Sequence, residues 1–146
     1  MAATPSDNLS SIYIPLRLTY GLVPLVAGID KFFNLLTDWG KYLPAVAVDR
    51  LPVSPSMFMM IVGVIEIVAG LAVLTLFTRL GAYVVMLWLV LIAANLVAAG
   101  YFDVAVRDLV MAVGAYTLGQ VAAVRGEKWI RIPSHPQGPT AHVASR

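Results

Sequence analysis

Glu66 is the residue whose position most needs a chemical explanation, because it lies inside an otherwise uncharged, apolar stretch, residues 57–77. As a helix, this stretch is long enough to cross a bilayer core of about 30 Å. A carboxylate near the middle of a membrane is costly unless it is paired, protonated or hydrated. Glu66 therefore marks either a site that handles a proton or a ligand, or a buried ion pair that fixes the register of the helices.

Four further polar residues are expected in the outer half of the same bundle. They are Lys31 near the end of the first apolar segment, Asn95 near the end of the third, and Arg107 and Asp108 at the start of the fourth. These segment ends meet on one side of the membrane, so the side chains can gather above Glu66. We expect Glu66 to pair with Lys31 or Arg107, and Asp108 to pair with the other cation.

Glycines share the helix faces that carry these charges, which predicts close helix packing there. The first segment has a stripe of residues spaced three and four apart: Arg17, Gly21, Pro24, Gly28 and Lys31. In the second segment, Gly63 and Gly70 share a face with Glu66. Arg17 lies nearer the inner side, where we expect its guanidinium to reach the lipid headgroups, and Asp30 should point away from the stripe.

Four apolar segments position these residues. We place them at about residues 12–36, 57–77, 80–99 and 104–124. Each approaches the roughly 20 residues that a membrane-spanning helix needs, and helices satisfy their own backbone groups in lipid. The short links between the last three segments require antiparallel neighbours. The sequence therefore predicts an all-α integral membrane protein, an up-down bundle of four helices within residues 12–124.

The remaining parts of the chain are predicted to be polar connections. Residues 1–11 form a polar N-terminal segment, and the first apolar segment is expected to be retained as a helix rather than cleaved as a signal peptide. The outer loop, residues 37–56, is either an interfacial loop with Trp39 and Tyr42 at headgroup level, or a cap or docking surface over the bundle. Residues 125–146 form a tail that is largely disordered from residue 133.

The distribution of Lys and Arg predicts the orientation. The side that holds both termini carries Arg79, Arg125, Lys128 and Arg131, whereas the other side carries Lys41 and Arg50, with Lys31 at its boundary. The positive-inside rule therefore places both termini in the cytoplasm and the protein in the inner (cytoplasmic) membrane.

The composition agrees with a membrane protein and excludes several kinds of chemistry. The 146 residues are 60% hydrophobic and 12% charged, and the mean hydropathy is +0.83. The chain has no Cys, which excludes disulfides, thiolate metal sites and iron–sulfur clusters. His135 and His142 lie in the tail, so the membrane segments offer no imidazole to a metal or haem. The net charge of +2 is scattered and gives no support for nucleic-acid binding.

Together these features resemble the DoxX-like family of small four-helix membrane proteins. The resemblance covers roughly residues 12–124. It rests on Gly28-Ile29-Asp30-Lys31-Phe32 at the end of the first segment, on Glu66, and on Arg107-Asp108 at the start of the fourth. It implies a small membrane subunit associated with oxidoreductases, since the family's name-bearing example belongs to a quinone-linked thiosulfate oxidation system. It nominates Lys31, Glu66, Arg107 and Asp108 as site residues.

The function expected from these observations is that of a membrane or quinone-side accessory subunit, with a polar pocket in the outer half of the bundle. Lys31, Arg107 or Asn95 would donate hydrogen bonds to quinone carbonyls, Glu66 or Asp108 would relay protons, and a redox partner protein would carry the electrons. Trp88 and Tyr116 are candidates to pack on the quinone ring. Two alternatives stay open, namely a proton-coupled transporter or permease, which could be a homo-oligomer, and a structural or assembly factor that binds no ligand.

Overall fold

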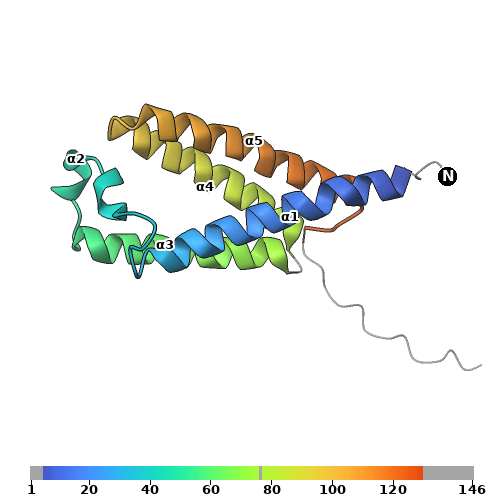
Figure 1. Ribbon diagram of the computed structural model, residues 1–146, viewed down its shortest axis with the longest axis horizontal. Helices are drawn as coiled ribbons and strands as arrows, with labels where there is room; N and C mark the ends of the chain where they lie inside the picture. Colours follow the sequence, from blue (N-terminus) through green and yellow to red (C-terminus); the bar gives the residue numbers. More distant parts are fainter. Residues whose placement is uncertain (1–4, 76, 130–146) are drawn as a thin grey trace, which may run out of the picture.

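The computed structural model describes residues 5–75 and 77–129, whose regular structure is helical with no strand in these two ranges (Figure 1). The elements are α1 (Pro5–Asp30), the 3-10 helix η1 (Trp39–Tyr42), α2 (Ala45–Val48), α3 (Pro55–Leu74), α4 (Thr78–Ala98) and α5 (Phe102–Val124). Residues 9–30 of α1 and the whole of α3, α4 and α5 are long and apolar enough to cross a membrane. The predicted all-α bundle of four membrane helices is confirmed. The expected tail disorder from residue 133, Arg131 and both histidines lie outside the described residues.

The first helix differs most from its predicted range, since α1 begins at Pro5 and ends at Asp30 rather than near residue 36. Asp30 itself ends the helix, because its carboxylate accepts hydrogen bonds from the backbone N–H groups of Leu35 and Leu36 at 3.0 and 3.1 Å. Asn34 adopts a φ of +51°, a conformation that Asn tolerates better than most residues. The chain therefore turns back, and Lys31 is the first residue after the helix.

Local capping sets the start of α3 slightly before the predicted residue 57. The Ser54 hydroxyl accepts a hydrogen bond from the Met57 N–H at 3.2 Å, and Pro55 occupies the first helical position, where its missing N–H costs nothing. The later helices also start slightly early, with α4 at Thr78 and α5 at Phe102. These shifts leave the up-down topology unchanged.

The four long helices form two closely packed pairs. α1 packs along α3 and α4 packs along α5, and the pairs meet mainly through α3 with α4 and α1 with α5. Figure 1 shows that the pairs converge at the end that holds the N-terminus and lie further apart at the end that holds α2. The larger buried cluster is built of small and medium side chains: Tyr13, Tyr20, Ala69, Val73, Ala82, Val85, Ala115, Leu118 and Ala122. Such residues let helix backbones approach closely in a membrane.

The outer loop caps the end where the pairs lie apart. η1 packs against α3, the Tyr42 carbonyl accepts a hydrogen bond from Asn95 Nδ2 of α4 at 2.9 Å, and the Tyr42 ring contacts the Tyr101 ring edge-on at 5.0 Å. Of the two interpretations of this loop, these contacts favour the cap. Trp39 is correspondingly turned inward to the bundle, where its ring contacts Lys31.

Arg17 makes contacts that the sequence did not predict. Its guanidinium donates hydrogen bonds to the carbonyl oxygens of Val73, Leu74 and Thr75 at 3.1, 2.7 and 2.6 Å. These carbonyls end α3 and have no partner within the helix. Because an unsatisfied carbonyl is costly in lipid, Arg17 stabilises this end of α3, and the expected contact with the headgroups stays a prediction.

Replacing Arg17 by Met, which keeps an unbranched apolar stem and removes the donors, is expected to lower the free energy of unfolding by about 2 kcal/mol. Equilibrium unfolding in mixed detergent micelles measures this change. Arg107→Met is the matched control, because Arg107 is exposed and forms no ion pair in the described part of the chain. Equal effects of the two substitutions would contradict a capping role for Arg17.

Candidate functional site

The centre of the site is a buried ion pair between α3 and the turn that follows α1. Lys31 Nζ lies 2.6 Å from Glu66 Oε2, and each residue is only 5% exposed. Of the two partners predicted for Glu66, the structure selects Lys31.

Glycines explain how these two side chains can meet. A Cβ atom on Gly63 would lie 2.6 Å from the Gly28 carbonyl oxygen and 3.1 Å from Lys31 Cβ, and a Cβ on Gly28 would lie 2.5 Å from the Gly63 carbonyl oxygen. A side chain at either position therefore cannot fit without separating the helices. The shared glycine face brings α1 against α3 one turn from Glu66, and Lys31 emerges at the end of that contact.

Trp39 closes the site from the outer loop. Lys31 Nζ lies 3.7 Å from the centroid of the Trp39 ring, a cation–π contact that gains strength where water is excluded. The indole Nε1 of Trp39 donates a hydrogen bond to Asp30 Oδ2 at 2.8 Å. Asp30 is itself buried, and its carboxylate also receives the Leu35 and Leu36 amides. Asp30 thus binds both Trp39 and the turn after α1. It can do so because its side chain points away from the glycine stripe, as predicted.

Asp108 lies near the pair without joining it. It is half-buried, and its charge is close enough to interact with those of Glu66 and Lys31. It forms no hydrogen bond or ion pair that the described residues reveal. The predicted pair between Asp108 and Arg107 is wrong, because adjacent helical residues point about 100° apart. Arg107 is turned outward and is exposed.

Asn95 does not contact the charged residues but holds the loop that covers them. Its side-chain amide holds the Tyr42 carbonyl, and through η1 it fixes the segment that carries Trp39. The prediction that Asn95 gathers with the charged residues is therefore met only indirectly. Tyr116 is exposed, and its ring contacts Tyr83 at a centroid distance of 6.2 Å.

Trp88 contributes a polar atom whose importance the sequence analysis missed. Its Nε1–H is buried and interacts with the Glu66 carboxylate without reaching hydrogen-bond geometry, so this donor has no hydrogen-bond partner among the described residues. A buried N–H in this state costs about 1–3 kcal/mol. From the sequence, Trp88 is a candidate only for its ring surface, and its seven-residue spacing from Asn95 is the one signal of a shared face.

The charges of the site are unbalanced. The carboxylates of Asp30, Glu66 and Asp108 lie within electrostatic reach of the single ammonium of Lys31. Hydrogen bonds from the turn and from Trp39 stabilise Asp30 as a carboxylate, and Lys31 compensates Glu66. Asp108 is left without a hydrogen-bond or ion-pair partner in the described part of the chain, next to the Lys31–Glu66 pair.

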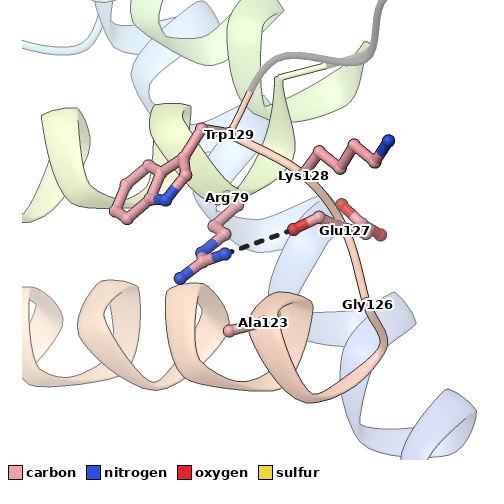
Figure 2. A pocket seen from close by; sticks show the side chains of 6 residues that line it. All are labelled: Arg79, Ala123, Gly126, Glu127, Lys128 and Trp129. Carbon is pink, nitrogen blue, oxygen red and sulfur yellow. Dashed lines mark hydrogen bonds between the residues drawn. The ribbon is translucent and has the colours of Figure 1, made fainter.

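The predicted polar pocket around Glu66 is not confirmed. The cavity that the structure records, about 490 Å³, lies at the opposite end of the bundle, between the start of α4 and the segment after α5 (Figure 2). Residues 5–75 and 77–129 also contain no group of three or more side chains arranged to hold a metal ion.

Comparison with protein families matches residues 12–100, more than half of the chain, to the family described as DoxX. The matched range includes Lys31, Trp39 and Glu66 and ends before α5, so Arg107 and Asp108 lie outside it. No curated protein and no solved structure matches the chain.

Proposed function

The chain belongs to the DoxX family, and from this premise we propose that it is a quinone-side membrane subunit of an oxidoreductase assembly in the inner membrane. Within this proposal, Lys31, Glu66, Trp88 and Asp108 bind the quinone headgroup and exchange its protons. A partner protein supplies the electrons, because the chain has no cysteine to hold an iron–sulfur cluster.

The observation that carries the proposal is the coexistence of a spare buried donor and a spare carboxylate beside one ion pair. The Trp88 Nε1–H lies near the Glu66 carboxylate without making a well-formed hydrogen bond, and a quinone carbonyl is an acceptor that needs no charge. Lys31 offers further N–H groups beyond the one that binds Glu66. A bound quinone supplies two-electron, two-proton chemistry, and Asp108 and Glu66 are the groups of this chain that can deliver or accept the protons.

Trp39 and Asp30 would control access in this arrangement. The Trp39 ring covers the Lys31 ammonium and is tied to Asp30, so entry from the outer end requires η1 to move. The cap separates the ion pair from water, which strengthens its interaction and keeps proton transfer confined to the cluster.

The proposal predicts that the tagged protein, purified in mild detergent, carries quinone and a stoichiometric redox partner. Trp88→Phe keeps an aromatic ring and removes the N–H donor. We expect the quinone content to fall by about tenfold while the helices stay folded, because the loss of one buried donor costs about 1–3 kcal/mol of binding free energy. Extraction and chromatography measure the quinone, and circular dichroism checks the fold. Trp129→Phe, at the opposite end of the bundle, is the matched control and should leave the quinone content unchanged.

A purified protein free of both quinone and partner would contradict the proposal. One observation then favours a second function, a proton-coupled transporter: the unpaired carboxylate of Asp108 next to a buried ion pair. Proton flux into proteoliposomes that contain this chain alone, lost in Asp108→Asn and kept in Asp103→Asn, would assign that function. Absence of both activities would favour the structural or assembly role.

A further inference from the structure

The recorded cavity lies far from the Lys31–Glu66 pair, at the end of the bundle that holds the N-terminus of α1. Its volume is about 490 Å³, it is open to the outside, and its lining comes from Arg79 at the start of α4 and from Ala123, Gly126, Glu127, Lys128 and Trp129 (Figure 2). None of these residues takes part in the site described above.

Arg79 brings an uncompensated positive charge to this cavity. Its Nη1 donates to the Glu127 backbone carbonyl at the long distance of 3.5 Å (Figure 2), and its Nε–H is buried without a hydrogen-bond partner in the described structure. The Glu127 carboxylate does not pair with Arg79 and instead accepts a hydrogen bond from the Tyr13 hydroxyl at 2.6 Å. The Arg79 guanidinium therefore has hydrogen-bonding capacity beyond its one long hydrogen bond, and charged guanidinium donors bind anion oxygens strongly.

Trp129 and Lys128 add to this preference for an anion and outweigh the Glu127 carboxylate, which also lines the cavity but is held by Tyr13. The Arg79 guanidinium carbon lies 4.2 Å from the centroid of the Trp129 ring, and stacking on a ring leaves the N–H groups at the guanidinium edge free to bind oxygen. Lys128 is exposed and forms no ion pair in the described part of the chain. Its side chain extends away from Arg79 in Figure 2, and its flexible stem allows it to contact an anion at the rim.

The position of the cavity along the membrane normal favours a lipid over a soluble anion. Arg79 and Ala123 lie at the ends of two membrane-spanning helices, where phosphate headgroups lie and where Trp is enriched. Leu80 and Val124, next to these residues, are 40% and 73% exposed and offer apolar surface to acyl chains. A phosphate in this cavity would therefore have lipid tails beside it along the bundle.

We propose that the cavity formed by Arg79, Lys128 and Trp129 binds the phosphate of an anionic phospholipid from the leaflet at this end of the bundle. Arg79 binds the phosphate oxygens through its free N–H groups, Lys128 closes over the rim, and Trp129 orients the guanidinium. The site ties the start of α4 to the end of α5 through the lipid, and it does not depend on the proposed quinone function.

Titration of the delipidated, detergent-purified full chain with phosphatidylglycerol and with phosphatidylcholine, followed by native mass spectrometry, tests the proposal. We expect about tenfold tighter binding of phosphatidylglycerol by the unmodified protein. Each cation near an anionic membrane surface contributes about 1 kcal/mol, or about fivefold in affinity, so Lys128→Gln should weaken binding by about that factor and Arg79→Gln by at least as much. Arg50→Gln, exposed at the other end of the bundle, is the matched control.

Three results would overturn the proposal. Equal affinities for the two lipids would remove the anion preference, and equal losses in Lys128→Gln and Arg50→Gln would show a general effect of surface charge. Full displacement of phosphatidylglycerol by millimolar inorganic phosphate, added as a competitor, would assign the cavity to a soluble anion. Lys128 is exposed, so Lys128→Gln keeps the test valid if Arg79→Gln fails to fold.

Discussion

Replacing Glu66 by Met is expected to lower the free energy of unfolding by about 3–5 kcal/mol, because it leaves the buried Lys31 ammonium without its hydrogen-bonded carboxylate. Lys31→Met is expected to cost less, since a buried carboxylate can take up a proton and become neutral. Both residues are only 5% exposed and lie 2.6 Å apart, so solvent can compensate neither of them without opening the bundle.

The double substitution Lys31→Met with Glu66→Met should recover most of the stability that Glu66→Met loses, because an apolar pair of similar volume replaces the ion pair. Equilibrium unfolding in mixed micelles for all four proteins gives the coupling energy, which we expect to be about 2 kcal/mol or more. Strictly additive losses would show that the two residues do not interact. Asp103→Asn, an exposed acidic residue at the start of α5, is the control and should change little.

The same double variant separates a structural role of the pair from a functional one. A protein that regains its stability but loses quinone, or loses proton flux, uses the charges in its chemistry. A protein that regains both stability and ligand uses the pair only to fix the register of α1 against α3.

Introducing side chains into the α1–α3 contact is expected to have the second large effect. A Cβ on Gly28 would meet the Gly63 carbonyl oxygen at 2.5 Å, and a Cβ on Gly70 would meet the Gly21 carbonyl oxygen at 2.5 Å. Each obstacle is backbone of the neighbouring helix, which cannot move aside as a flexible side chain can. Gly28→Ala gains about 1 kcal/mol in helix propensity and loses more through separation of the helices, so we expect a net loss of about 1–2 kcal/mol.

Gly28→Val should amplify the loss, because it adds bulk at the same point, and it should also weaken the ion pair that follows at Lys31. Gly40→Ala is the control, since the atom that its Cβ would meet is the Asp38 carboxylate oxygen at 3.2 Å, the end of a flexible side chain in the loop. Unfolding in mixed micelles measures all three variants. A neutral or stabilising effect of Gly28→Val would contradict the close contact of α1 with α3.

The sequence determined the class of the protein and the number and order of its membrane helices. Runs of about 20 apolar residues are a local property, and lipid permits such runs only as helices, so composition and length were sufficient. The short links then required antiparallel neighbours. Glu66 and Lys31 could also be singled out, because an isolated charge in an apolar run is visible without knowing what surrounds it.

Only the tertiary structure decided which charges meet. Lys31 and Arg107 were equal candidates for Glu66 by depth, and the choice depended on the rotation of each helix about its axis, which places Arg107 outward and Lys31 inward. The capping of α3 by Arg17 likewise required two segments far apart in sequence to lie side by side. Rotation and helix contacts depend on packing over the whole bundle, and no local pattern encodes them.

The outer loop shows the same limit most clearly. An interfacial Trp39 and a Trp39 turned onto Lys31 have the same local sequence, and the difference arises because Asp30 ends α1 early and receives both the turn amides and the indole N–H. Apolar run length is set residue by residue and can be read from the chain. The partner of a buried charge depends on which distant groups compete for the same few hydrogen bonds. Only the packed tertiary structure brings those groups together, so the partner cannot be predicted from the local sequence.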